Sequence, residues 1–337
     1  MKKIRAGIVG VSGYTGLELT KILITHPNFE LSYASNTQGG VLLSQLHPCL
    51  EGVFDIEVKK TEIDEVAKNC DVVFLALPHK AAMGFAKELA SSDVKIVDLS
   101  ADYRLSASNY ELNYCEHIDK EGLASAVYGL PELFGEQIKS AKLLANPGCY
   151  PTATLLALAP FAKYIDEKSP VFVDAKSGVS GAGKKCVDRT HFVSANENLF
   201  AYDPITHRHS VEISEKIEII SGKPFHITFV PQLLPITRGM LSNVYATLKE
   251  DIEPLEVLRE FYKDSAFVRV KESAVQLKSV CGTNFCDLYA AKNKNALFVN
   301  SAIDNLLRGA SSQAVVNANI MFGLSEDAGV PKIAYAP

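Results

Sequence analysis

The stretch that decides the fold is IRAGIVGVSGYTG, residues 4–16. Its first half, Ile4–Val9, is a short apolar run typical of a buried strand, and its second half carries Gly10, Gly13 and Gly16 at regular spacing. The segment Tyr14–Thr25 then has apolar residues at helical spacing, which predicts a helix. A strand that runs through a glycine turn into a helix predicts the beginning of a dinucleotide-type α/β domain.

The glycine turn has the chemistry of a phosphate site. Its G-x-x-G-x-x-G spacing differs from the usual G-x-G-x-x-G, and an ordinary strand–helix turn is the alternative that the spacing leaves open. Glycines let the backbone approach a pyrophosphate closely, and a helix N-terminus supplies N–H groups and a positive dipole end. We expect cofactor contacts at Gly10, Ser12, Gly13, Tyr14, Thr15 and Gly16.

The end of the second expected strand, Phe29–Ser35, indicates which dinucleotide binds. NAD-specific sites usually place Asp or Glu there to bind the ribose 2′-hydroxyl. This strand instead ends in Ala34-Ser35-Asn36-Thr37-Gln38, which contains no acid. A 2′-phosphate would meet hydroxyls and amides without repulsion, so we expect NADP(H), with Ser35 among its contacts.

Strand and helix segments alternate up to Pro147, which predicts parallel strands with right-handed crossovers. Beyond Pro147 strand-like runs dominate, and their apolar–polar alternation favours an antiparallel sheet with one face covered. A last helix carries an apolar stripe from Ile303 to Met321. We therefore expect an α/β Rossmann-like dinucleotide-binding domain from residues 1–147 and 304–337, and an α+β domain with a mainly antiparallel sheet from residues 148–303.

Composition excludes several classes of protein. The chain has 337 residues, with 34 Lys+Arg against 39 Asp+Glu and no basic block, which argues against nucleic acid or an anionic membrane as partner. Its apolar runs are too short to span a bilayer, and Glu18 interrupts the start where a signal peptide would stay apolar. Seven cysteines with no CxxC pair indicate a reducing, cytoplasmic compartment.

Cys149 is the candidate nucleophile. The segment Asn146-Pro147-Gly148-Cys149-Tyr150-Pro151 places it at an expected helix start, where the dipole stabilises a thiolate and backbone N–H groups can hold an oxyanion. A buried structural cysteine is the ordinary alternative, and we assign that role to the other six.

His207 and His209, in His207-Arg208-His209-Ser210-Val211-Glu212, are the best candidates for acid/base work, because histidine titrates near neutral pH. If the segment is extended, the two histidines share one side, and we lean toward His207 as the partner of Cys149. A solvated loop is the alternative. No third ligand accompanies the H-x-H pattern, and Cys281 with Cys286 lack a second pair, so we expect no metal.

Three further groups have suggestive chemistry. The segment from Lys176 to Lys185 combines glycines, hydroxyls and cations, as an anion site does, although a flexible basic loop has the same composition. Arg104 follows a parallel strand, at the edge where α/β ligands bind, although a plain surface arginine would have the same local sequence. Gln313 and Asn317 are four residues apart on the last helix, so both can face a nicotinamide amide. The alternative is that they simply cap the polar face of that helix.

Nine segments in chain order together resemble the N-acetyl-gamma-glutamyl-phosphate reductase family of arginine biosynthesis: GVSGYTG, LALPHKAA, DLSADYRL, YGLPELF, NPGCYPTAT, DAKSGVSGAG, HRHSVEI, PITRGMLS and NLLRGASSQAVVNANIMFG. The resemblance covers nearly the whole chain. It implies the architecture shared with aspartate-semialdehyde dehydrogenase and, more distantly, glyceraldehyde-3-phosphate dehydrogenase, with residues 148–303 serving catalysis and dimerisation.

The resemblance also implies the reaction, an NADPH-dependent reduction of N-acetyl-glutamyl 5-phosphate to the 5-semialdehyde with release of phosphate. Cys149 would match the family nucleophile, His207 and His209 its acid/base histidines, and Glu212 an orienting partner. Further cofactor contacts are expected at Pro78, His79, Ser177, Gly178, Gln313 and Asn317. Substrate contacts are expected at Arg104, Asn146, Ser180, Gly181, Lys184, Arg208 and Arg238. We expect a homo-oligomer, dimer or tetramer.

Two departures from the family pattern matter. Members usually have Arg after SGAG, where this chain has Lys184, and many have His where Pro231-Gln232-Leu233 stands here. Lysine is a point charge without the fork of Arg. Two other functions stay open: a reductase for another acyl phosphate, aspartyl or N-blocked aminoadipyl phosphate, and a non-catalytic NADP sensor. The retained Cys149 argues against the sensor.

Overall fold

The computed structural model describes residues 2–336, which form two compact units. Unit 1 comprises Met1–Pro147 and Ala310–Pro331, and unit 2 comprises Gly148–Gly309 and Lys332–Pro337. The sequence led us to place residues 304–309 and 332–337 in the first domain, whereas the structure groups them with unit 2.

Unit 1 is a doubly wound α/β structure with a sheet in the order β3-β4-β2-β1-β5-β6-β8-β7. Its strands are β1 Ile4–Val9, β2 Phe29–Asn36, β3 Val41–Leu42, β4 Glu57–Lys60, β5 Val72–Leu75, β6 Lys95–Asp98, β7 Val127–Tyr128 and β8 Leu143–Ala145. All adjacent pairs are parallel except β3 with β4. Strands β1 and β5 carry apolar residues on both faces, as expected for a sheet covered on both sides.

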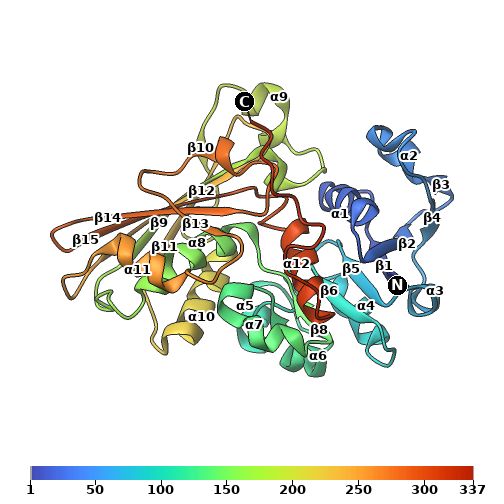
Figure 1. Ribbon diagram of the computed structural model, residues 1–337, viewed down its shortest axis with the longest axis horizontal. Helices are drawn as coiled ribbons and strands as arrows, with labels where there is room; N and C mark the ends of the chain where they lie inside the picture. The colour runs from blue at the N-terminus through green and yellow to red at the C-terminus, as the bar shows by residue number, and fades with distance from the viewer. Residues whose placement is uncertain (1, 337) are drawn as a thin grey trace. The chain divides into compact units, whose positions relative to one another are not determined.

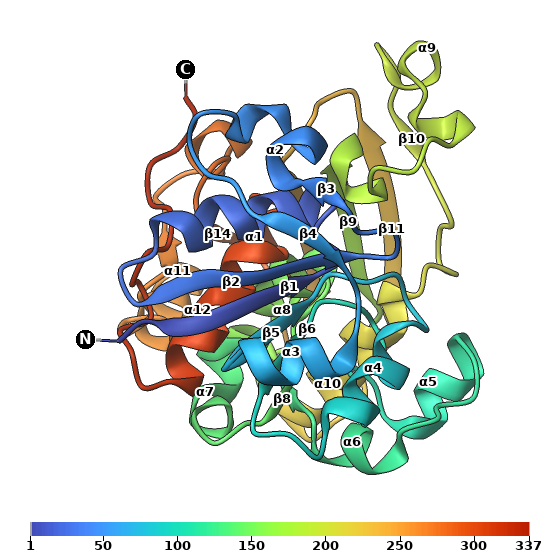
Figure 2. The same ribbon diagram turned by 90° about the vertical axis from the view of Figure 1, so that its right-hand side faces the viewer.

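Helices cover both faces of this sheet. They are α1 Tyr14–Thr25, α2 Leu43–Leu46, α3 Ile63–Asn69, α4 Ala82–Leu89, α5 Ala107–Asn113, α6 Lys120–Ser125, α7 Pro131–Lys139 and α12 Ser311–Met321. Helices α1 and α12 pack together on one face, and α3 and α4 lie together on the other (Figure 2). The last long helix of the chain therefore completes the layer that α1 begins.

Unit 2 is built on a mixed sheet in the order β10-β11-β9-β12-β15-β14-β13. Its strands are β9 Val171–Gly178, β10 Phe200–Ala201, β11 Ile227–Leu234, β12 Met240–Thr247, β13 Val268–Val270, β14 Cys286–Asn293 and β15 Ala296–Ile303. Four of the six adjacent pairs are antiparallel. The α+β class expected from the alternating pattern is therefore confirmed.

The longer helices of unit 2 lie on one face of its sheet. The helices are α8 Cys149–Leu158, α9 Phe192–Ala195, α10 His209–Ser221 and α11 Pro254–Phe261, and of these α8, α10 and α11 lie on the same side (Figure 1). Helix α8 is almost entirely buried and packs on β12 and β15. The opposite face carries Phe172 and Tyr245, which are 50% and 42% exposed. One face of this sheet thus forms the core and the other lies open.

One condition that the sequence left open is not met, and one expectation about local structure is wrong. The chain around His209 is not extended, because His209 is the first residue of α10. The stripe from Ile303 to Met321 is not one helix, because Ile303 ends β15 and α12 begins at Ser311. Between them the carboxylate of Asp304 accepts bonds from the amides of Leu306 and Leu307, which makes the chain turn instead.

Candidate active site

The glycine turn of unit 1 is shaped by contacts that only glycine permits. Gly10 has a φ of +92°, and a Cβ there would lie 2.3 Å from the carbonyl oxygen of Ala76. A Cβ on Gly16 would lie 2.6 Å from the carbonyl oxygen of Val11. At Gly13, the N-cap of α1, the nearest atom would be 4.0 Å away. Gly10 and Gly16 are therefore needed for packing, whereas Gly13 leaves open space beside a helix N-terminus.

The end of β2 supports this turn. The carbonyl of Ser35 accepts bonds from the amides of Gly10 and Val11, at 2.9 and 3.1 Å. Ser35 is fully buried and its hydroxyl accepts a bond from Thr61. Its side chain therefore packs inside unit 1, and the accessible part of the strand end begins at Asn36. The amide of Asn36 donates to Ser12 Oγ at 2.9 Å, and its Oδ1 accepts two backbone N–H bonds.

Several other expected cofactor contacts of unit 1 have structural partners. His79 Nδ1 accepts a bond from the Ala101 amide, and the preceding Pro78 is exposed. Gln313 and Asn317 are fully buried on α12. Asn317 Nδ2 donates to the carbonyl of Gly129 and to Asn146 Oδ1, at 2.8 and 3.1 Å. Helix α12 thus directs the amide of Asn317 into unit 1.

Arg104 and Asn146, both expected at the substrate, form one buried group in unit 1. Arg104 is 5% exposed, and its guanidinium donates to the carbonyls of Asn146 and Leu99. The Asn146 amide N–H donates to the Asp98 carbonyl, and its side chain donates to the Ala310 carbonyl. These bonds fix the backbone three residues before Cys149.

Unit 2 begins with the turn that presents Cys149. Gly148 is the N-cap of α8, in an extended conformation, and Cys149 is the first residue of the helix. The structure therefore confirms the expected position of this cysteine at a helix start. The Gly148 amide donates to Glu212 Oε1 at 3.0 Å, and Glu212 is buried in the first turn of α10. This carboxylate holds the turn that carries Cys149 and stands where the α10 dipole favours negative charge.

The two histidines lie close together although the segment is helical. Their ring centroids are 4.9 Å apart, and both meet the edge or face of Tyr150, the residue after Cys149. His207 also contacts the rings of Tyr202 and Phe229. Arg208, between them, is exposed. The bend before α10, rather than strand alternation, brings both imidazoles to one side.

The surroundings of His207 determine the protonation state and the tautomer of its imidazole. Burial lowers the pKa of His207 to about 4, although the charge of Asp203 opposes this. Its Nδ1 accepts a bond from the His209 amide at 3.1 Å. A neutral imidazole whose Nδ1 accepts must carry its hydrogen on Nε2. At neutral pH His207 is therefore a hydrogen-bond donor rather than a base.

The anion loop of unit 2 follows β9. Ser177 is buried with its hydroxyl on the Gly178 carbonyl, and a Cβ on Gly178 would lie 2.8 Å from the backbone of Arg238. Ser180 is also buried, whereas Gly181 and Lys184 are exposed. Gln232, at the family's usual histidine position, donates to Asp174, and its carbonyl accepts from Tyr150. The loop therefore begins with a tight backbone turn, and it is exposed to solvent at Lys184.

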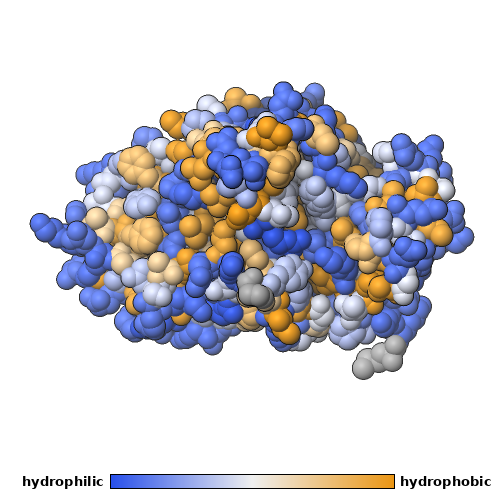
Figure 3. All heavy atoms as spheres, turned by 90° about the horizontal axis from the view of Figure 1, so that it is seen from above, coloured by the Kyte–Doolittle hydropathy of each residue, from blue (hydrophilic) through white to orange (hydrophobic). Residues whose placement is uncertain are grey.

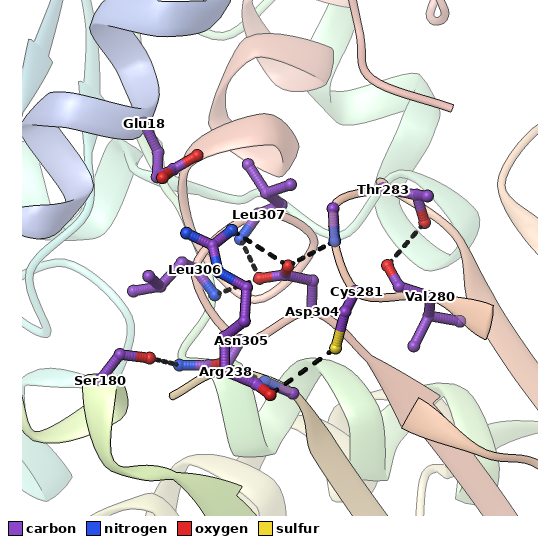
Figure 4. A network of polar contacts seen from close by, with 12 residues as sticks. Glu18, Ser180, Arg238, Val280, Cys281, Thr283, Asp304, Asn305, Leu306 and Leu307 are labelled. Atoms are coloured by element: carbon purple, nitrogen blue, oxygen red, sulfur yellow. Dashed lines mark hydrogen bonds and ion pairs between the residues drawn. The ribbon is translucent and has the colours of Figure 1, made fainter. Parts of the chain in front are cut away.

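The turn after β15 ties these parts of unit 2 together (Figure 4). Asp304 is fully buried, and its Oδ2 accepts bonds from the Gly282 amide and from Arg238 Nη1. Asn305 bonds Ser180 and the Gly239 amide. A Cβ on Gly309 would lie 2.6 Å from that of Cys149. The sequence singles out neither Asp304 nor Tyr202, because neither stands in a chemical motif, and it assigns no role to Asn305 within its quoted segment.

No group of three or more His, Cys, Asp or Glu suited to a metal occurs within residues 2–336. Over the same residues, no helix has the length and apolar character needed to cross a membrane.

A dinucleotide-type unit joined to a unit that presents a cysteine at a helix start defines a class of oxidoreductase, and family models identify it. The model "Semialdehyde dehydrogenase, NAD binding domain" matches residues 5–141 and "Semialdehyde dehydrogenase, dimerisation domain" matches residues 149–305. The chain thus has the nicotinamide-dinucleotide-binding and dimerisation domains of the semialdehyde dehydrogenases.

Curated relatives narrow this class. N-acetyl-gamma-glutamyl-phosphate reductase of Sulfurovum sp. is 60% identical over 99% of this chain and 100% of the relative. The enzyme of that name from Wolinella succinogenes is 59% identical over the full length of both. The chain belongs to the N-acetyl-gamma-glutamyl-phosphate reductase family.

Solved structures agree on the fold. Aspartate semialdehyde dehydrogenase II from Vibrio cholerae has a TM-score of 0.73 at 15% identity, covering 96% of this chain and 99% of that one. Aspartate semialdehyde dehydrogenase with NADP from Candida albicans has a TM-score of 0.68 at 16% identity, covering 95% and 99%. At these identities the likeness shows the fold alone.

Proposed function

We propose that the chain reduces N-acetyl-gamma-glutamyl phosphate to N-acetyl-glutamate semialdehyde with NADPH, releasing phosphate, in arginine biosynthesis. The observation that carries this proposal is Cys149 as the first residue of α8, after a glycine N-cap held by Glu212. The names of the full-length relatives indicate which acyl phosphate is the substrate. The chemistry requires a nucleophile, an oxyanion site and a proton carrier, and each has a candidate in unit 2.

Cys149 attacks the acyl carbon as a thiolate. The positive end of the α8 dipole lowers the cost of that charge and also stabilises the oxyanion that forms on the acyl oxygen. Phosphate leaves and a thioester remains. The dinucleotide, when bound, supplies the hydride that reduces the thioester carbonyl. The resulting thiohemiacetal then loses the Cys149 sulfur and releases the aldehyde.

We assign the proton carrier to His209. His207 accepts the His209 amide at Nδ1, which leaves no lone pair for a thiol proton. This reverses our preference for His207 from the sequence. His207 acts as a neutral donor beside Tyr150 and Tyr202, and Glu212 holds the cysteine turn through Gly148.

Residues of unit 1 suit an NADP molecule. Gly13 offers open space at the uncapped N-terminus of α1, where phosphate binds well. The end of β2 presents Asn36, Thr37 and Gln38 rather than an acid. Ser12, oriented by Asn36, completes the set. None of these residues carries an acidic group that would repel a 2′-phosphate. NADP is therefore the proposed dinucleotide.

The open face of unit 2 supports a homo-oligomer, dimer or tetramer. Tyr245 lies directly opposite Phe172 on one side and Phe298 on the other, which makes an aromatic row across three strands. Figure 3 shows apolar residues interspersed with polar ones on the surface seen from above. Tyr245→Lys should shift the protein to monomers in sedimentation velocity. An unchanged sedimentation coefficient would show that this face of the sheet is not the interface between copies of the chain.

The cytoplasm is the proposed compartment, because the seven cysteines are free, as a reducing compartment keeps them.

NADPH oxidation measured with three acyl phosphates tests the proposal. N-acetyl-glutamyl phosphate should give the highest kcat/KM. A higher value with aspartyl or N-blocked aminoadipyl phosphate would identify a different reductase. Protein that binds NADPH yet turns over none of the three would be a sensor.

A further inference from the structure

Asn305 occupies a defined place in unit 2, in the turn that follows β15. It is 2% exposed, so its amide must find partners within the protein. Its Oδ1 lies 2.7 Å from the backbone nitrogen of Gly239, and its Nδ2 lies 2.9 Å from Ser180 Oγ (Figure 4). The side chain thus bridges the turn at Gly239 and the anion loop.

The orientation of this amide is fixed by chemistry. A backbone N–H is only a donor, so the atom that faces the Gly239 nitrogen must be the oxygen of the amide. The NH₂ group then faces Ser180. Asn305 is therefore the donor and the Ser180 hydroxyl oxygen is the acceptor in their bond.

The direction of this bond decides what Ser180 can do. Its oxygen accepts from Asn305, so its own hydrogen points away from Asn305 and is offered to another acceptor. Ser180 is 7% exposed, and its backbone is held by the Thr237 carbonyl. A hydroxyl fixed in this way has little rotational freedom to lose when an anion binds.

The turn at Gly239, to which Asn305 is bonded, also carries a cation. Arg238 directly precedes Gly239, whose amide Asn305 holds. Arg238 Nη1 lies 3.2 Å from Asp304 Oδ2, and its guanidinium lies over the ring of Tyr335. Gly309, at the other end of the turn, lies against Cys149. One turn therefore supports the hydroxyl, the cation and the nucleophile.

We propose that Asn305 is a positioning residue that makes the Ser180 hydroxyl an obligate donor to an anionic oxygen of the substrate. This inference rests on the proposed function, because the anion is part of the acyl phosphate. Asn305 does not touch the anion; it determines which way the Ser180 hydrogen points. The anionic oxygen is phosphate or carboxylate, and the reverse reaction separates the two.

Asn305→Asp tests the polarity of the bond. The new carboxylate still accepts from Gly239, but it also accepts from Ser180 and so turns the hydroxyl away from the substrate. The reverse reaction joins N-acetyl-glutamate semialdehyde and inorganic phosphate, and NADP⁺ takes the hydride. We expect the KM for phosphate or for semialdehyde to rise by about tenfold to a hundredfold, with the KM for NADP⁺ unchanged. The reactant whose KM rises identifies the anion.

Ser180→Ala provides a second arm. It should raise the same KM, and adding Asn305→Asp to it should produce no further rise, because both act through one hydroxyl. Asn300→Asp is the matched control. Asn300 is also a buried amide, on β15, but its partners are Val275 and Asn243. This control should leave both KM values unchanged.

The pH profile distinguishes positioning from structural damage. Burial raises the pKa of a carboxyl group, and once protonated the introduced group can donate to Ser180 again. The KM of Asn305→Asp should therefore return toward the wild-type value as the pH falls. Asn305→Ala, which leaves the hydroxyl unoriented, should show a smaller rise and no recovery. It also serves as the test variant if Asn305→Asp does not fold.

Three results would overturn the inference: unchanged KM values in both Asn305 variants, additive effects of Asn305→Asp and Ser180→Ala, or no recovery at low pH. An inactive wild-type protein would instead refute the proposed function.

Discussion

Two helix starts in this chain are built alike and used differently. Helix α1 and helix α8 both follow a sheet strand, both begin after a glycine N-cap, and neither has a side-chain cap. Before α1 the turn is Gly10-Val11-Ser12-Gly13, and Gly13 leaves open space. Before α8 the turn is braced by Glu212, and a cysteine is the first helical residue. We therefore expect the positive end of the helix dipole to serve a bound anion at α1 and a reacting group at α8.

The largest effect is expected at the α8 start. Cys149→Ser removes the thiolate but adds no volume, so the fold should persist. We expect kcat to fall by about 10⁴-fold or more while NADPH still binds, as measured by steady-state kinetics and NADPH fluorescence. A variant with wild-type turnover would show that the two helix starts do not differ in chemistry.

The next effect separates the two histidines before α10. His209→Asn removes the proposed base, and kcat should fall by about 10²–10⁴-fold with a small change in KM. His207→Asn keeps an acceptor for the His209 amide and should cost about tenfold at most. Equal losses in both variants would assign proton transfer to the pair. A larger loss at His207 would restore the preference drawn from the sequence.

The α1 start is tested by a pair of alanine substitutions. Gly16→Ala forces a Cβ against the Val11 carbonyl and should lower stability by about 1–3 kcal/mol in urea unfolding. Gly13→Ala meets no atom closer than 4.0 Å and should leave stability unchanged. Its KM for NADPH should nevertheless rise roughly tenfold, because a methyl group then occupies the space of a phosphate. If Gly13→Ala binds NADPH normally, phosphate does not lie there.

Cofactor preference provides a smaller test of the same region. Asn36→Asp retains acceptors for the two backbone amides and adds a negative charge at the end of β2. The ratio of kcat/KM for NADPH to that for NADH should fall by about tenfold, because the carboxylate repels a 2′-phosphate. Asn36→Asp suits this test better than a change at the buried Ser35. An unaltered ratio would indicate that the 2′-phosphate does not bind near Asn36.

The smallest effect concerns pH and stability. The pKa of His207 is about 4 in the folded state, below its usual value near 6.5, because of burial. The unfolded chain therefore binds more protons between these pH values. The contribution of His207 to the free energy of unfolding is complete above pH 6.5 and is lost as the pH falls toward 4. His207→Asn should flatten the decline in the free energy of unfolding over this range, measured by urea titration. An equal decline in both proteins would exclude His207 as its source.

Much of the fold follows from local patterns. The alternation of apolar runs and helical spacing predicts the α/β unit, and helix α1 is found over the expected residues, Tyr14–Thr25. Cys149 at the start of α8 follows from Pro and Gly around it. These features are predictable because they depend on residues close in the sequence.

Other features have no local signal. The N-cap of α10 is Arg208, which is not a capping residue, so nothing in the segment marks a helix start. The apolar stripe from Ile303 to Met321 continues through a strand end, a turn and a helix, because all three are buried. Burial of Ser35 depends on Thr61, from another strand's end. The bond between Asn305 and Ser180 joins positions 125 apart, so only the folded chain reveals it.

The turn from Asp304 to Gly309 has a consequence for the evolution of substrate size. One of its ends lies against Cys149 and the other holds Ser180. The span between the nucleophile and the oriented hydroxyl is therefore set by the length of this turn together with the reach of the Asn305 amide. A lineage that adopts a substrate one methylene longer or shorter can change this span by inserting or deleting residues in the turn, by replacing Asn305, or by recruiting a different hydroxyl.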